Sequence, residues 1–146
     1  MIAVDTNLLV YSHRADAPFH VVARDIVAGL AEDTSRWAIP WPCIHEFLGN
    51  VTNPRIYKLP TPLDKATEQV ETWLGSPGLR LLGETNDYWE TLRGLLDSSQ
   101  VVGAKVHDAR VAAICLSHGV LELLTADRDF SRFGGLKVRN PLRESD

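Results

Sequence analysis

The sequence contains few of the residues that build thiol, zinc or membrane-spanning sites. Cys43 and Cys115 are the only cysteines among 146 residues, and neither has a second Cys or a His at metal-ligand spacing. We therefore expect no typical zinc centre, and both thiols should pack in the core of a protein from a reducing compartment. No stretch approaches the ~18 apolar residues of a membrane span, and no signal-peptide pattern precedes Ile2. We expect a cytoplasmic protein without membrane contact.

Basic charge is also scarce. The net charge is -4, whereas proteins that coat nucleic acids usually have an excess of Lys and Arg. This balance does not exclude a nuclease, because bound metal ions can neutralise an acidic pocket locally. The sequence lacks the motifs G-x-x-x-x-G-K-[ST], G-x-G-x-x-G after a strand and G-x-S-x-G. Asp5-Thr6-Asn7 lacks the second acid, two residues on, of an aspartyl-phosphate hydrolase, so covalent phosphoryl transfer is not favoured.

The length and the hydrophobic content of 45% predict one domain over residues 1–142, followed by a frayed tail at 143–146. Short apolar runs alternate with helical patterns, which predicts an α/β protein with a mostly parallel sheet covered on both faces. The expected strands are 2–4, 37–40, 79–82, 120–124 and 136–138. A first helix is expected to begin near residue 8, and further helices are expected at 20–32, 41–52, 61–74, 86–96 and 106–119. Thr61 and Thr85 are expected to cap the helices that follow them, and Trp89 to face inward.

Asp108 carries a carboxylate on the apolar side of the helix expected at 106–119. At about 3.6 residues per turn it shares a stripe with Val111, Ala112 and Cys115, which directs it toward the core. Burying an unpaired carboxylate costs on the order of several kcal/mol, so the charge requires a metal, a cation or a cap. The alternative is a simple interaction with the helix dipole, because Asp108 lies in the first turn.

Three further acids are expected at the same edge of the sheet. Asp5 and Asp127 follow strands at their carboxyl ends, where open parallel sheets bind ligands. Glu46 lies between small residues on the helix expected at 41–52, and its alternative is an ordinary solvated carboxylate. Like charges raise one another's pKa, so four converging acids are most readily explained by a hard divalent cation such as Mg²⁺ or Mn²⁺. Such an ion polarises a phosphoryl oxygen and activates a water, which indicates phosphodiester hydrolysis.

Four segments carry a resemblance to a known family. They are M-I-A-V-D-T-N at the start, P-W-P-C-I-H-E-F-L at 40–48, H-D-A-R-V-A-A-I at 107–114 and L-T-A-D-R-D-F at 124–130. In this order and over almost the whole chain, they make the sequence resemble the PIN domain, and specifically the VapC toxins of type II toxin–antitoxin pairs. The resemblance implies a PIN-like three-layer α/β/α sandwich with a short, mostly parallel central sheet.

The resemblance also implies an activity, that of an endoribonuclease dependent on Mg²⁺, for which Mn²⁺ substitutes. Asp5, Glu46, Asp108 and Asp127 would form the catalytic and metal-binding centre, with Asp5 and Asp108 foremost as direct ligands. The implied substrates are structured RNAs, typically tRNA or rRNA loops. The implied partners are a second copy in a homodimer and a cognate antitoxin protein. The alternative hypothesis is a non-catalytic module that binds RNA or an antitoxin through the same surface.

Supporting positions follow from the same resemblance. Asn7 and Thr125 match polar residues that support the acidic centre in the family. Thr6 either does the same or caps the first helix, and both interpretations stay open. Asp129 resembles an accessory acid, with a turn-stabilising Asp as its alternative.

Three arginines are the candidates for RNA contacts near the acids in the sequence. Arg14, Arg110 and Arg128 could bind phosphates or stack on unpaired bases. Arg110 lies about half a turn from the stripe of Asp108, so a salt bridge, an RNA contact and a solvated side chain all remain open.

Overall fold

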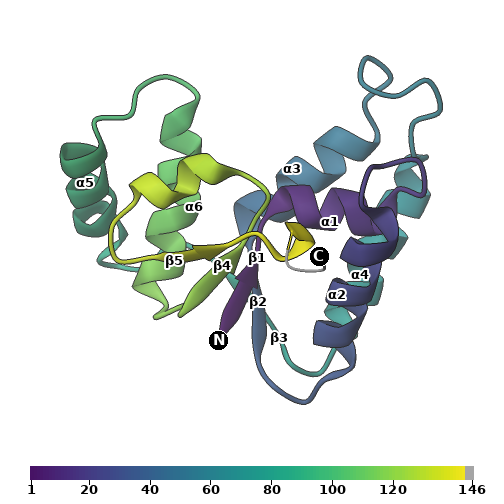
Figure 1. Ribbon diagram of the computed structural model, residues 1–146, viewed down its shortest axis with the longest axis horizontal. Coiled ribbons are helices and arrows are strands. Elements are labelled where there is room, and N and C mark those ends of the chain that lie inside the picture. The colour runs from purple at the N-terminus through teal and green to yellow at the C-terminus, as the bar shows by residue number, and fades with distance from the viewer. Residues whose placement is uncertain (144–146) are drawn as a thin grey trace.

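The computed structural model describes residues 1–143 as a parallel five-stranded sheet flanked by helices (Figure 1). The strand order is β3-β2-β1-β4-β5, and every pair of neighbouring strands is parallel. The strands are β1 (Ile2–Val4), β2 (Trp37–Pro40), β3 (Leu79–Leu82), β4 (Glu122–Leu124) and β5 (Lys137–Arg139). Since β1 lies between β2 and β4, the amino-terminal strand is the centre of the sheet, and the predicted parallel arrangement is confirmed.

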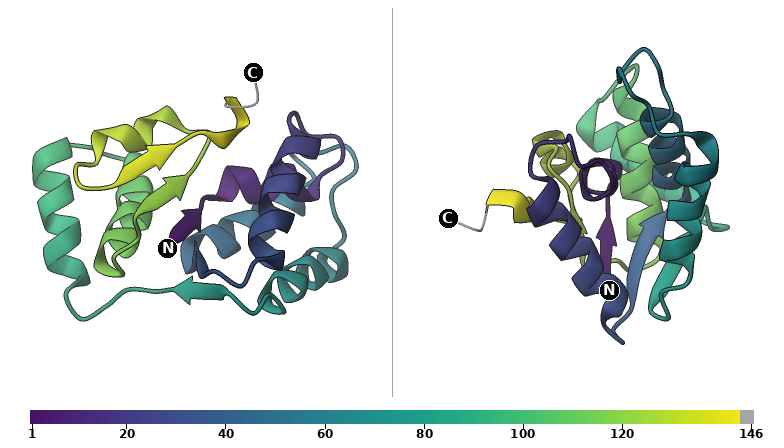
Figure 2. Two further views of the ribbon diagram at one scale, coloured as in Figure 1. Left: turned by 60° about the horizontal axis from the view of Figure 1, so that its bottom comes forward. Right: turned by 90° about the vertical axis from the view of Figure 1, so that its right-hand side faces the viewer.

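Helices lie on both sides of the strands, as the two views of Figure 2 show. They are α1 (Thr6–His13), α2 (His20–Glu32), α3 (Trp41–Val51), α4 (Leu63–Leu74), α5 (Tyr88–Ser99) and α6 (Lys105–Ser117), with the short 3₁₀ helices η1 (Arg128–Arg132) and η2 (Pro141–Arg143). This arrangement confirms the predicted three-layer α/β/α sandwich. Of the tail predicted at 143–146, Arg143 ends η2, and residues 144–146 lie outside the described part of the chain.

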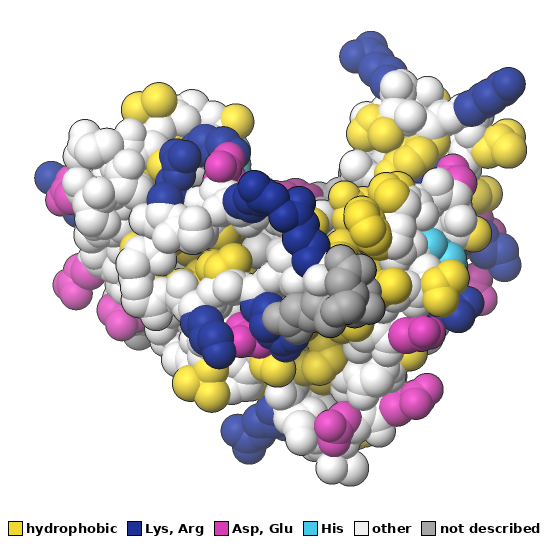
Figure 3. All heavy atoms as spheres, viewed as in Figure 1, with side chains coloured by type: hydrophobic (Ala, Val, Ile, Leu, Met, Phe, Trp, Pro, Cys, Tyr) yellow, Lys and Arg dark blue, Asp and Glu magenta, His cyan; other side chains and the backbone are white. Residues whose placement is uncertain are grey.

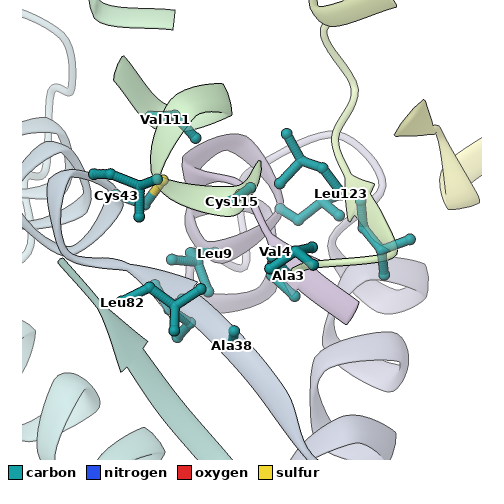
Figure 4. Packing of buried hydrophobic residues seen from close by; sticks show 14 of the residues in the cluster. Ala3, Val4, Leu9, Ala38, Cys43, Leu82, Val111, Cys115 and Leu123 are labelled. Atoms are coloured by element: carbon teal, nitrogen blue, oxygen red, sulfur yellow. The ribbon is translucent and has the colours of Figure 1, made fainter. Parts of the chain in front are cut away.

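The core packs against the central strands and explains their apolar sequences. All residues of β2 and β4 are buried, and all but Glu122 are apolar, because strands covered on both faces need apolar side chains on both. Glu122 is compensated by salt bridges with Lys137 and Arg139 of β5. Figure 4 shows how Val4, Leu9 and Leu123 meet side chains from α3 and α6. Cys43 and Cys115 are buried free thiols within this cluster, so their predicted role as core residues is confirmed.

Two predicted helix starts are wrong. The α4 helix begins after Pro62, and the Thr61 hydroxyl instead lies 3.1 Å from His13 Nε2 and accepts a hydrogen bond from Arg14. The α5 helix begins at Tyr88, and Thr85 does not cap it. The Thr85 hydroxyl donates to the Asp87 carboxylate and accepts no hydrogen bond from an N–H group of the helix.

The α5 helix is also turned differently from the expectation. Its buried stripe consists of Leu92 and Leu95, which leaves Trp89 60% exposed instead of facing inward. The terminal residues of the other helices differ by only a few positions from the prediction. Within residues 1–143, no helix is long and apolar enough to cross a membrane.

Candidate active site

Asp5 lies at the carboxyl end of the central strand, where the chain turns directly into α1. Its main-chain N–H extends the β1–β4 ladder by donating to the Leu124 carbonyl at 3.0 Å, and its Oδ1 caps α1 by accepting from the Thr6 N–H at 2.8 Å. The residue is only 5% exposed. This burial raises the pKa of Asp5 from 3.8 to about 6, although hydrogen bonds from Thr125 and Thr6 oppose the change.

A hydrogen-bonded group from both ends of the chain holds the Asp5 carboxylate. Thr125 Oγ1 donates to Asp5 Oδ2 at 2.8 Å, and Asn7 Nδ2 donates to Thr125 Oγ1 at 3.0 Å. In turn, Asn7 Oδ1 accepts from the Ala126 N–H at 3.1 Å, and the Asp127 N–H donates to Thr125 Oγ1 at 3.0 Å. Asn7 and Thr125 therefore fix both the Asp5 carboxylate and the backbone that carries Asp127.

Glu46 reaches the same region from α3. Thr6 Oγ1 donates to Glu46 Oε2 at 2.6 Å, which joins the first residue of α1 to the middle of α3. The capping alternative for Thr6 is wrong, because the Asp5 side chain caps α1. Thr6 instead orients the exposed Glu46 carboxylate toward the cleft, and only one of its two oxygens is used in doing so.

Asp108 lies in the first turn of α6, at the rim of the cleft rather than in the core. Its helix neighbours Val111, Ala112 and Cys115 are buried as expected, but its own side chain is 27% exposed. Lys105, three residues earlier, places Nζ 3.6 Å from Asp108 Oδ2. Burial and the nearby charge of Asp127 raise the pKa of Asp108, and Lys105 opposes them.

Asp127 and Asp129 lie together after β4 but differ in surroundings. Asp127 Oδ1 caps η1 by accepting from the Asp129 N–H at 2.9 Å. The Asp129 carboxylate forms a close ion pair with Lys105, and that hydrogen bond lowers its pKa. Asp129 thus faces a cation of the protein itself, while Asp127 faces the cleft.

The four acids line one cleft of about 310 Å³. Its wall is formed by acids, small polar residues and aromatic or aliphatic side chains: Asp5, Thr6, Asn7, Val10, Tyr11, Glu46, Asn50, Tyr57, Asp108, Val111, Asp127 and Phe130. Neither His nor Cys is among them. Within residues 1–143, no three acidic, His or Cys side chains are close enough to hold one metal ion between them. Each of the four carboxylates is instead engaged by hydroxyl, N–H or ammonium donors of the chain.

The three arginines predicted near the site have different environments. Arg14, predicted as a possible RNA contact, is only 8% exposed and is paired with Asp16, so little of its guanidinium is accessible to RNA. Arg110 forms a salt bridge with Glu84 at 2.7 Å, which selects one of the alternatives left open for it. Arg128 is exposed at the start of η1, next to the acids.

Two residues at the site were missed in the sequence. Lys105 could have been found, because an i,i+3 spacing places it beside Asp108 on one helix face. Tyr57 could not, because it enters the cleft from a loop without regular structure, and its contacts with Arg14, directly after α1, and with Asn50 of α3 place it there.

The fold and the acidic cleft agree with the comparisons to known proteins. The family model of the PIN domain matches residues 2–136 of the chain, which therefore belongs to the PIN-domain family. Ribonuclease VapC48 of Mycobacterium tuberculosis is 30% identical over 137 residues, covering 94% of both chains. VapC ribonuclease Mb2897 of Mycobacterium bovis is 34% identical over 142 residues, covering 97% of this chain and 96% of the relative. Within the PIN domains, the chain is a member of the VapC ribonucleases.

Solved structures support the same fold. The sarcin-ricin loop cleaving toxin VapC20 of M. tuberculosis superposes with a TM-score of 0.69 at 19% identity, covering 96% of this chain and 100% of that chain. The family, the fold and the enzyme class predicted from the motifs are thus confirmed, and the non-catalytic alternative is not favoured.

Proposed function

We propose that the chain is the toxin of a type II toxin–antitoxin pair and hydrolyses phosphodiester bonds in structured RNA with a divalent metal ion. The observation that carries the proposal is the convergence of Asp5, Glu46, Asp108 and Asp127 on one cleft of a VapC ribonuclease. Asp5 caps α1, but its carboxylate is buried at the centre of the sheet, where its charge is costly, and a bound cation would offset that cost.

The donor set of the cleft fits Mg²⁺ or Mn²⁺. Its walls offer carboxylate, amide and hydroxyl oxygens without His or Cys, which suits hard cations and not zinc. Mg²⁺ keeps several waters and is usually held by only one or two carboxylates, so it does not require three of the acids in residues 1–143 to lie close together. Asp5 and Asp108 are the residues we assign as direct ligands. The bound ion would supply a polarised phosphoryl oxygen and a more acidic water.

The other polar residues of the cleft and its rim orient the carboxylates and a water molecule for hydrolysis. Thr6 donates to Glu46 Oε2, which leaves Oε1 to accept a hydrogen bond from a water molecule in the cleft. Asp127 is oriented by its cap on η1 and adds negative charge beside Asp108. Lys105 holds Asp129 out of the cleft, so we assign Asp129 to charge balance at the rim and not to the metal.

Partners and substrate follow from the relatives. VapBC2 of Rickettsia felis was solved bound to a DNA fragment from the promoter of the pair, and FitAB was solved bound to a DNA fragment. We infer a cognate antitoxin for this chain as well, a homodimer, and a cytoplasmic site of action. The substrate class, loops of tRNA or rRNA, is supported by the name of VapC20 as a sarcin-ricin loop cleaving toxin.

The test is cleavage of total bacterial RNA by the purified chain, with the 5′ ends of the products mapped. Mg²⁺ or Mn²⁺ should support cuts at one or a few positions, and EDTA should stop them. Asp5→Asn and Asp108→Asn should each lose more than the roughly 10- to 100-fold that removal of an outer-shell partner costs a metal site. Asp64→Asn, on the exposed first turn of α4, is the matched control and should cut normally. Full activity of either cleft variant would refute the assignment.

A further inference from the structure

The loop between α3 and α4 forms one wall of the acidic cleft. We call residues 53–60 the α3–α4 loop. Tyr57 from this loop lines the cleft together with the four acids, and its hydroxyl donates to Asn50 Oδ1 on α3 at 2.6 Å. An aromatic ring is thereby fixed within the same pocket as the groups that we assign to phosphodiester hydrolysis.

Arg14 holds this loop in place. Its guanidinium lies 3.7 Å over the centre of the Tyr57 ring, and its Nη2 donates to the Leu59 carbonyl at 3.0 Å. Asp16 in turn fixes the guanidinium through two hydrogen bonds of 2.8 and 2.7 Å. Arg14 is therefore a positioning residue: it covers one face of the Tyr57 ring, and Tyr57 remains part of the lining of the cleft.

The backbone of the loop is ordered by its own hydrogen bonds. The N–H groups of Ile56 and Tyr57 both donate to the Asn53 carbonyl at 3.1 Å, and the Thr61 N–H closes the loop onto the Val51 carbonyl at 2.7 Å. Asn53 Oδ1 accepts from the Arg55 N–H at 2.9 Å. A loop with this many internal bonds presents its side chains in a fixed arrangement, which lowers the entropy cost of binding.

The exposed side chains of the loop include two cations. The chain has no acidic residue between Glu46 and Asp64, while Arg55 and Lys58 are exposed and form no ion pair with any residue in 1–143. Figure 3 shows dark-blue side chains projecting at the upper right, where Figure 1 draws the loop between α3 and α4. In a protein of net charge -4, this local excess of positive charge is complementary to a polyanion.

We propose that the α3–α4 loop is the RNA-recognition element of the enzyme: Tyr57 stacks on an unpaired base beside the scissile phosphate, and Arg55 and Lys58 bind the flanking phosphates. Unpaired bases stack on aromatic rings without strict sequence preference, and cations on the rim bind the backbone that leads to them. The proposal rests on the proposed nuclease function. The cations of the α3–α4 loop would attract the RNA backbone electrostatically, which the acidic cleft cannot do without a bound metal ion.

The experiment measures RNA binding in the Asp5→Asn background, which prevents cleavage. The probe is a fluorescein-labelled, unstructured 20-nucleotide RNA of mixed sequence, titrated by anisotropy from about 50 to 300 mM KCl in Mg²⁺. Arg55→Ala/Lys58→Ala should weaken binding roughly 10-fold or more near 100 mM KCl and reduce the slope of log K against log salt by about 1.4, since each phosphate contact with a single strand contributes about 0.7. Arg36→Ala/Arg80→Ala is the matched control, because both residues are exposed near the amino ends of β2 and β3, away from the cleft.

The stacking role has its own readout. Tyr57→Leu should weaken binding about 5- to 100-fold without changing the salt slope, whereas Tyr57→Phe, which keeps the ring, should bind within about 2-fold of the parent. In an otherwise wild-type enzyme the same loop variants should raise KM for total tRNA more than they lower kcat, and circular dichroism checks that they remain folded.

Two results would overturn the proposal. Loop variants that bind the RNA probe like the Arg36/Arg80 control would exclude RNA recognition by this loop. Loop variants that keep RNA affinity but no longer co-purify with a co-expressed cognate antitoxin would assign the surface to a protein partner instead. Failure of the proposed function is distinct, because then the unmodified chain itself would cut no RNA in Mg²⁺.

Discussion

Replacing Asp5 by Asn should stabilise the metal-free protein while abolishing cleavage. Burial raises the pKa of Asp5 from 3.8 to about 6, which means that the ionised carboxylate destabilises the fold at neutral pH. Each tenfold change in proton affinity corresponds to about 1.4 kcal/mol, so this cost is about 3 kcal/mol. The Asn amide retains an oxygen that accepts from the Thr6 N–H, but it cannot accept the hydrogen bond from Thr125. The loss of this hydrogen bond lowers the stability of the variant by about 1 kcal/mol. The expected net gain is about 2 kcal/mol.

The pH dependence of this gain identifies its cause. Because the pKa of Asp5 is higher in the folded than in the unfolded state, the native protein binds the proton more tightly between about pH 4 and pH 6. The free energy of unfolding of the wild type is therefore highest, as far as Asp5 is concerned, below about pH 4, and it falls as the pH rises from about 4 to 6. The difference between the Asn variant and the wild type should be small near pH 4 and complete above about pH 7.

Thermal unfolding in EDTA, followed by circular dichroism at several pH values, measures the effect. At roughly 3 °C per kcal/mol for a chain of this size, the variant should melt about 6 °C above the wild type near pH 7.5. Added Mg²⁺ should raise the Tm of the wild type more than that of the variant, because only the wild type retains both carboxylates that we assign as direct ligands. Asp25→Asn, exposed on α2, is the control and should change little. A variant that melts at or below the wild type in EDTA, with no dependence on pH, would refute the reasoning.

Two further predictions concern the charges at the rim and the close packing of a turn. Lys105→Met removes the cation that pairs with Asp129 and approaches Asp108, so the Mg²⁺-induced rise in Tm should be larger than in the wild type; an unchanged rise would show that Lys105 does not compete with the ion. Gly78→Ala would place a Cβ 2.3 Å from the Ser35 carbonyl oxygen and should lower the free energy of unfolding by more than about 1 kcal/mol, whereas Gly94→Ala, in open space within α5, should raise it by about 0.5–1 kcal/mol. Urea denaturation of both glycine variants checks this contrast.

Local patterns in the sequence located most of the acidic centre. Asp5 and Asp127 could be placed because apolar runs define strands, and the carboxyl ends of parallel strands meet at one edge of a sheet. Asp108 could be placed from the helical period of its neighbours, but that period overestimated its burial, because the side chain lies at the rim of the cleft and is 27% exposed. Their convergence at one edge of the sheet indicated a divalent cation and phosphodiester hydrolysis, and the family resemblance then specified an endoribonuclease.

Contacts between residues that are far apart in the sequence could not be predicted from local patterns. Arg14 was expected to contact RNA, yet the fold buries it against Tyr57 and the Leu59 carbonyl. The α5 helix was expected to turn Trp89 inward, yet its packing against α6 selects a different stripe. In both cases, residues of similar local pattern differ only in what the rest of the chain brings beside them.

By itself, then, the sequence determined the parallel α/β architecture, the buried thiols and the acids that follow β1 and β4, because the periods of apolar residues act within a few turns or one strand. Only the tertiary structure decided that Thr6 orients Glu46, that Lys105 balances Asp129, and that the α3–α4 loop carries Tyr57 into the cleft. These pairings join segments far apart in the chain, and their energies depend on burial and distance, which no local pattern of residues encodes.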